Sequence, residues 1–118
     1  MKACILADDL SGAADCALGF GRAGRRAEVL LHAAPGEEEI VALDTDSRPL
    51  PASVAAARAV TAYRAMHASG AKLYKKIDST LRGPWAAEVA ALQPLAGLAI
   101  VAPAFPAVGR TVRNGHVY

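Results

Sequence analysis

The chain has 118 residues, of which 53% are hydrophobic and 20% are charged, and its formal net charge is +2. This length and composition allow one globular domain with a hydrophobic core, but not two. The small net charge and the 5% content of aromatic residues argue against nucleic acid as a partner, because nucleic-acid binding relies on basic surfaces and stacking platforms.

Short apolar runs alternate with helical patterns along the chain. In chain order, we predict a strand over 3–7, a helix over 11–22, strands over 27–31 and 40–44, a helix over 52–69, a strand over 72–77, a helix over 84–93 and a strand over 98–101. Such alternation is typical of an α/β fold. We therefore expect an open, mainly parallel sheet of about five strands flanked by helices, in a Rossmann-like three-layer arrangement.

Two connections depart from this pattern. The link 32–39 has no helical pattern, although parallel crossovers usually take a dozen or more residues. The chain either crosses there in extended form or one neighbouring strand is antiparallel, and both arrangements remain open. Near the end, Asn114-Gly115 indicates a β-hairpin over 111–118. Because domains seldom stop just past a tight turn, we expect the chain to be the front piece of a longer protein.

The sequence favours a cytoplasmic protein without a membrane partner. The apolar run before Asp8 is too short for a signal peptide. The charge-free stretch 89–108 is interrupted by prolines and a glycine, so it indicates a buried helix end, a strand and a loop instead of a membrane span. Cys4 and Cys16 are expected to be reduced thiols. The three histidines lack zinc-like spacing, and no metal site is predicted.

Polar clusters follow four of the five predicted strands. They are Asp8-Asp9, Asp44-Thr45-Asp46-Ser47-Arg48, the stretch from Lys76 to Gly83, and a loop that contains Arg110. Because the carboxyl ends of parallel strands share one edge of the sheet, these clusters are expected to form a site. The cations Arg48, Lys76, Arg82 and Arg110 can hold a carboxylate or a phosphate. The carboxylates Asp8, Asp9 and Asp78 can accept hydrogen bonds from sugar hydroxyls, and one of them could act as a general base.

Each of these residues also has a simpler interpretation. Asp8 or Asp9 could cap the first helix, and Asp46 or Ser47 could brace the turn before Pro49. An internal ion pair between Arg82 and Asp78 could order their loop, and Arg110 could be a solvated surface residue. Their shared location, at the strand ends, favours the functional interpretation of the set.

The same segments resemble those of the four-carbon acid sugar kinases, and specifically the N-terminal domain of that family. The matching pieces are Ala7-Asp8-Asp9-Leu10-Ser11-Gly12-Ala13-Ala14-Asp15, Asp44-Thr45-Asp46-Ser47-Arg48, Tyr74-Lys75-Lys76-Ile77-Asp78-Ser79-Thr80-Leu81-Arg82-Gly83, and Ala102-Pro103-Ala104-Phe105-Pro106 running through Gly109-Arg110-Thr111 to Asn114-Gly115-His116. They occur in the family's order and cover nearly the whole chain. The stretch from Lys76 to Gly83 is the most specific piece.

The resemblance implies an ATP-dependent kinase that acts on threonate, erythronate or their oxo derivatives. Family members resemble a pair of α/β domains, so residues 1–118 would be the sugar-acid-binding N-terminal domain. ATP and Mg²⁺ would be bound mainly by a nucleotide-binding C-terminal domain that this chain lacks, and the chain alone is expected to be inactive. Carried over by position, the residues on the sugar-acid side are Asp8, Asp9, Ser47, Arg48, Lys76, Asp78, Ser79, Thr80, Arg82 and Arg110. Arginines are expected to anchor the substrate carboxylate while an aspartate orients or deprotonates the attacking hydroxyl.

Two other functions share part of this pattern. A signalling receiver domain has a similar length, paired acids after its first strand and an acid after its third. A metal-dependent phosphohydrolase is suggested by the apolar strand that leads into Asp44, which would be the nucleophile. Neither alternative explains the stretch from Lys76 to Gly83.

Overall fold

The computed structural model describes residues 1–66 and 70–118. Its elements, in chain order, are β1 (Ala3–Ala7), α1 (Leu10–Arg22), β2 (Ala27–Leu30), β3 (Ile40–Asp44), α2 (Ala52–Ala65), β4 (Lys72–Lys76), α3 (Trp85–Ala96), the 3₁₀ turn η1 (Pro106–Val108), β5 (Val112–Arg113) and β6 (His116–Val117). The end of the predicted second helix, 67–69, lies outside the described residues.

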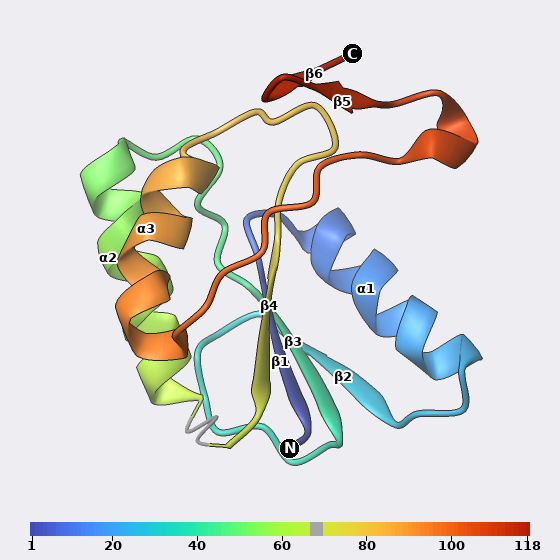
Figure 1. The fold of residues 1–118 in the computed structure, drawn as a ribbon. Helices are drawn as coiled ribbons and strands as arrows, with labels where there is room; N and C mark the ends of the chain where they lie inside the picture. Colours follow the sequence, from blue (N-terminus) through green and yellow to red (C-terminus); the bar gives the residue numbers. More distant parts are fainter. Residues whose placement is uncertain (67–69) are drawn as a thin grey trace.

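The centre of the fold is a four-stranded parallel sheet in the order β2-β3-β1-β4. Helix α1 covers one face of the sheet, and α2 and α3 lie together over the other (Figure 1). This arrangement confirms the predicted α/β fold with three layers. None of the helices described is long and apolar enough to cross a membrane.

The two central strands, β3 and β1, are continuously apolar because both of their faces are buried, as β1 illustrates. Cys4 and Leu6 pack toward α2 and α3, whereas Ile5 and Ala7 pack toward α1. A strand buried on both faces has no polar side to present, so it shows no alternation between apolar and polar residues. Burial raises the pKa of the Cys4 thiol to about 12, and both cysteines are free thiols.

The link between β2 and β3 crosses in extended form, because β2 and β3 are parallel. Glu28 supports this crossing: its Oε1 accepts hydrogen bonds from the backbone N–H groups of Glu37, at 2.7 Å, and Glu38, at 3.1 Å. Gly36 is required by close approach, since a Cβ there would overlap the methyl groups of Val41. The open question about strand direction is therefore resolved without an antiparallel strand.

The predicted fifth strand is wrong. Residues 98–101 run beside β4 and α3 in the described chain without pairing to β4, and the side chains of Leu98 and Ile100 are 89% and 85% exposed. Helix α3 also continues through Pro94 to Ala96 instead of ending at Gln93. Strand propensity describes how a residue fits a sheet, and the residue type alone cannot supply the hydrogen-bonded neighbour that a strand requires.

The hairpin over 111–118 is confirmed, with β5 and β6 antiparallel. Asn114 and Gly115 both have positive φ angles, 49° and 77°, which is the conformation of a type I′ turn. In Figure 1 the hairpin lies above the carboxyl ends of the parallel strands, at the end of the sheet where the polar clusters lie.

Candidate functional site

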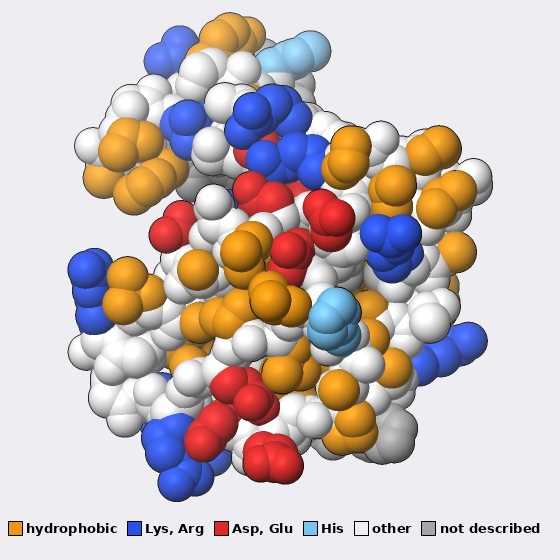
Figure 2. Space-filling model, turned by 180° about the vertical axis from the view of Figure 1, so that it is seen from behind, with side chains coloured by type: hydrophobic (Ala, Val, Ile, Leu, Met, Phe, Trp, Pro, Cys, Tyr) orange, Lys and Arg blue, Asp and Glu red, His pale blue; other side chains and the backbone are white. Residues whose placement is uncertain are grey.

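The candidate site lies where β1, β3 and β4 end side by side. Asp8 and Asp9 follow β1, the segment Thr45 to Arg48 follows β3, and Asp78 begins the loop after β4. Figure 2 shows acidic and basic side chains gathered next to one another on this part of the surface, close to the C-terminal segment. The common location that the sequence predicted is therefore present.

Arg48 binds carboxylates from two other chain segments. Its Nε and Nη2 donate to the two carboxylate oxygens of Asp8, each at 3.1 Å. Its Nη1 lies 3.3 Å from Asp9 Oδ2, and its Nη2 lies 3.3 Å from Asp78 Oδ1. These neighbours, and the hydrogen bonds to Asp8 above all, raise the pKa of the Arg48 guanidinium. One guanidinium thus connects the ends of all three strands.

Asp78 organises the loop that follows β4. Its Oδ2 accepts the backbone N–H groups of Thr80 and Arg82, the Thr80 hydroxyl at 2.7 Å and Arg82 Nε at 2.9 Å. Its Oδ1 accepts Arg82 Nη2 at 2.8 Å, which makes the Arg82 pair bidentate. The loop needs this support because Leu81 has a positive φ of 61°, which is unfavourable for a leucine. The internal ion pair between Arg82 and Asp78 is confirmed.

The Arg82 guanidinium, with the hydrogen bonds from Thr80, holds the pKa of the Asp78 carboxyl well below its usual range. Because the folded state binds a proton at Asp78 less readily than the unfolded state, Asp78 stabilises the fold above its unfolded pKa, about 3.9. That contribution is lost progressively as the pH falls below this value toward the lower folded pKa.

We expect the free energy of unfolding to fall steeply between about pH 5 and pH 2. Asp78→Asn should flatten this dependence, whereas Asp15→Asn, at an exposed position of α1, should leave it unchanged. Urea unfolding followed by circular dichroism across this range measures both. An Asp78→Asn variant with the full acid dependence would refute the assignment.

Asp9 forms the cap of α1, as one of the simpler interpretations predicted. Its Oδ1 accepts the backbone N–H of Gly12 at 2.9 Å. A Cβ at Gly12 would lie 2.8 Å from that oxygen and 3.2 Å from Lys76 Cγ, so Lys76 passes close to the start of α1. Lys76 Nζ donates to the carbonyl of Ile77 at 2.6 Å. Asp9 and Lys76 are therefore neighbours at the rim of the cluster.

The three carboxylates of the cluster differ in exposure. The side chain of Asp9 is 32% exposed, whereas those of Asp8 and Asp78 are 1% and 4% exposed. The buried carboxylates of Asp8 and Asp78 are paired with the guanidinium groups of Arg48 and Arg82, respectively. An incoming ligand can therefore reach Asp9 more easily than Asp8 or Asp78.

Ser47 belongs to a different network, which the sequence did not reveal. Its buried hydroxyl donates to Oε1 of Glu88, and Oε2 of Glu88 lies 3.2 Å from Lys75 Nζ. Glu88 and Lys75 were missed because charged residues are expected in solvent. One signal could have found Glu88: with Leu92, four residues later, it forms the buried side of α3.

The remaining predicted residues lie beside the cluster. Thr80 and Arg110 line one shallow hollow together with Tyr118, and Arg110 forms no ion pair with another residue in ranges 1–66 and 70–118. Ser79 is exposed. Ion pairs thus join five predicted residues, namely Asp8, Asp9, Arg48, Asp78 and Arg82, and the hydrogen bonds to Asp78 attach Thr80 to them.

Asp44, the nucleophile of the phosphohydrolase alternative, has a local role. Its Oδ1 accepts the backbone N–H of Asp46 at 2.8 Å, which braces a turn in which Asp46 has a positive φ of 46°. This geometry is that of an Asx turn.

Residues 3–118 match the model of a family described as the sugar-binding N-terminal domain. The chain belongs to this family. A D-threonate kinase from Cupriavidus necator is 56% identical over 119 residues, which cover 97% of this chain and 29% of that protein. A D-erythronate kinase from Heliobacterium modesticaldum is 34% identical, with 96% of this chain and 28% of that protein covered. The sugar-binding domain described here thus spans less than a third of the length of these relatives.

A solved structure from Bordetella bronchiseptica has the same fold. It is described as a domain of unknown function with bound citrate, in a domain-swapped dimer. This sugar-binding domain matches it with a TM-score of 0.87 and 41% sequence identity, over 100% of this chain and 32% of that one.

The described residues of this sugar-binding domain do not fit Mg²⁺. Within the described ranges there is no group of three or more histidine, cysteine or acidic side chains placed to hold a metal ion. Asp8 and Asp78, which would be the natural oxygen ligands, are instead neutralised by Arg48 and Arg82.

Proposed function

We propose that this domain binds the sugar acid of an ATP-dependent kinase that phosphorylates four-carbon acids such as threonate, erythronate or their oxo derivatives. The observation that carries the proposal is the charged cluster at the ends of three adjacent parallel strands, built around Arg48. The names of the relatives, which include D-threonate and D-erythronate kinases, support this substrate class.

We assign the ligand contacts to the groups outside the bidentate pairs of Arg48 with Asp8 and of Arg82 with Asp78. Asp9 Oδ2, on a side chain that is 32% exposed, lies 3.3 Å from Arg48 Nη1 and can accept a further hydrogen bond from a sugar hydroxyl. Lys76, beside Asp9, and Arg110, across the hollow lined by Thr80, supply positive charge for the acid's carboxylate. Arg48 and Arg82 serve mainly to hold Asp8 and Asp78, with Ser79 and Thr80 as further hydroxyl partners at the exposed loop.

Phosphoryl transfer depends on positioning and on neutralisation of charge, with little covalent chemistry from the protein. In the proposed reaction, Asp9 orients the attacking hydroxyl and accepts its proton. ATP and Mg²⁺ are bound mainly by another part of the kinase, a nucleotide-binding domain that is the partner of this one, so the domain alone is inactive. We also propose that the kinase, because it uses ATP, is cytoplasmic.

A titration of this chain with D-threonate tests the proposal. We expect heat of binding with a dissociation constant in the millimolar range or below. Asp9→Asn should weaken binding by about tenfold to a hundredfold, since a hydrogen bond to a charged group contributes about 1.5–3 kcal/mol. Asp15→Asn, also on the first helix but exposed, is the matched control. Absence of binding of both threonate and erythronate at millimolar concentration, with an intact circular dichroism spectrum, would overturn the proposal.

A further inference from the structure

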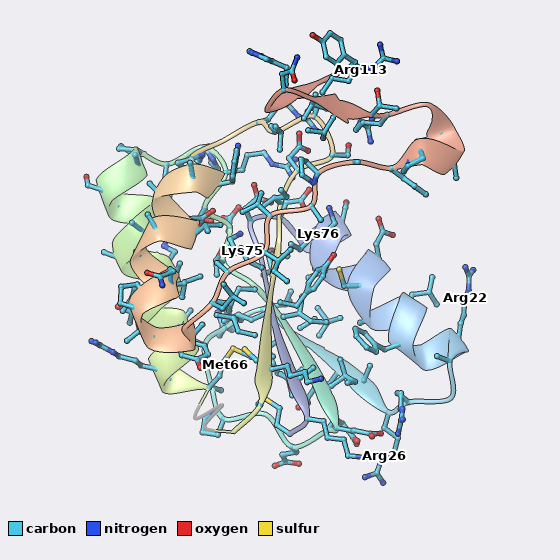
Figure 3. The ribbon with its side chains drawn as sticks, in the orientation of Figure 1. Arg22, Arg26, Met66, Lys75, Lys76 and Arg113 are labelled. Carbon is cyan, nitrogen blue, oxygen red and sulfur yellow. The ribbon has the colours of Figure 1, made fainter. Side chains whose placement is uncertain are left out.

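The two adjacent lysines of β4 lie on opposite faces of the sheet. Lys76 extends along the α1 side, where its Cγ would meet a Cβ at Gly12, and Lys75 extends toward α3, where its Nζ lies 3.2 Å from Glu88 Oε2 (Figure 3). Alternation along a strand requires this separation. Lys75 therefore has no direct access to the cluster around Arg48, and its charge needs another explanation.

Lys75 and Glu88 form a buried ion pair. Their side chains are 8% and 0% exposed. Lys75 Nζ also donates to the carbonyl of Lys76 at 3.1 Å, while Glu88 Oε2 accepts no aligned hydrogen bond from the described residues. Removing two charges from water is costly, and a hydrophobic pair of similar volume is often at least as stable. The stability of the fold alone therefore does not explain why an ion pair, and not a hydrophobic pair, is buried here.

The donors and acceptors around Glu88 can be assigned from their chemistry. A glutamate carboxylate only accepts, so the Ser47 hydroxyl donates to Glu88 Oε1. The Thr45 hydroxyl donates to the carbonyl of Ala7 at 2.8 Å, and its oxygen lies 2.8 Å from the Ser47 oxygen. Glu88 thus accepts the single hydrogen of the Ser47 hydroxyl, in the segment that leads from β3 to Arg48.

Arg48 is the next residue after Ser47, and the backbone N–H groups of both donate to the carbonyl of Asp8, at 3.1 and 3.3 Å. We propose that Glu88, kept in place by Lys75, is a positioning residue: it holds Ser47 so that the Arg48 guanidinium meets the carboxylates of the candidate site. The inference rests on the proposed function as far as the ligand is concerned, but the position of Arg48 can be measured without any ligand.

Two double variants of equal size separate positioning from folding. In K75M/E88Q the charges are gone but the amide oxygen still accepts the Ser47 hydroxyl, whereas in K75M/E88M that acceptor is lost. Both are compared with the unmodified chain in urea unfolding, in titration with D-threonate, and in the ¹⁵N NMR signal and hydrogen exchange of the Arg48 Nε–H group, which donates to Asp8 Oδ2.

We expect K75M/E88Q to retain binding within about threefold and K75M/E88M to lose about tenfold, the equivalent of one hydrogen bond. The Arg48 Nε–H should exchange faster in K75M/E88M alone. If both double variants fold and show the same Arg48 exchange, Glu88 is a structural residue only and the inference fails. If the unmodified chain does not bind threonate while the Arg48 signals still differ, the proposed function fails and the positioning role stands.

Discussion

Arg48→Ala is expected to abolish sugar-acid binding and to lower the free energy of unfolding by about 3–5 kcal/mol, the cost of leaving a buried charge without its partner. The side chain of Asp8 is 1% exposed and takes both of its side-chain hydrogen bonds from Arg48. Without the guanidinium, three carboxylates would face one another across the ends of β1 and β4. Urea unfolding and calorimetric titration measure the two effects.

A second substitution at the same position separates charge from geometry. Arg48→Lys keeps the positive charge but cannot bind Asp8 with two parallel hydrogen bonds, so it should recover only part of the stability. Arg22→Ala, in the exposed last turn of α1, is the control and should unfold like the unmodified chain. An Arg48→Ala variant that binds threonate normally would remove Arg48 from the site.

Asp78→Ala is expected to release the loop 78–83 and to cost about 3–5 kcal/mol of stability, because the buried carboxylate is the common acceptor of that loop. It accepts two backbone N–H groups, from Thr80 and Arg82, and the paired guanidinium of Arg82. Without these bonds the positive φ of Leu81 loses most of its support, although the Leu81 N–H still donates to the backbone carbonyl of residue 78 at 3.0 Å. Sugar-acid binding should fall with the order of the loop.

Amide hydrogen exchange measures this release directly. The Thr80 and Arg82 N–H groups should lose protection in Asp78→Ala, while the amides of β1, at the centre of the sheet, keep theirs at a denaturant concentration where the variant is folded. Asp15→Ala is the matched control on an exposed helix position. Unchanged protection at Thr80 and Arg82 would show that Asp78 does not organise the loop.

Most of the fold could be predicted because its signals are local. The apolar runs of β1 and β3, the Asn114-Gly115 turn and the glycine after α1 each act through neighbours in the sequence. The prediction over 98–101 was wrong because pairing with β4 is not local: the apolar residues have strand propensity, yet their backbone is not joined to the sheet.

The site could be located but not resolved into roles. The sequence placed Asp9, Arg48 and Asp78 at one edge of the sheet, and the geometry joins them. The sequence also left open whether Asp78 binds a ligand or Arg82. In the structure, the Asp78 carboxylate accepts five hydrogen bonds from Thr80 and Arg82, so Arg82 is its main partner.

The amino-acid sequence by itself determined the alternation of strands and helices up to α3, the mainly parallel character of the sheet and the strand ends at which the charged residues lie, since these depend on periodicity and on turn chemistry. The direction of β2 relative to β3 was left to the tertiary structure. Only the tertiary structure decided the partners: Arg48 with three carboxylates, Lys76 beside Asp9, and Lys75 with Glu88 on the opposite face. The physical reason is that hydrogen bonds and ion pairs form over about 3 Å between side chains far apart in the chain. Such distances exist only after the strands have aligned.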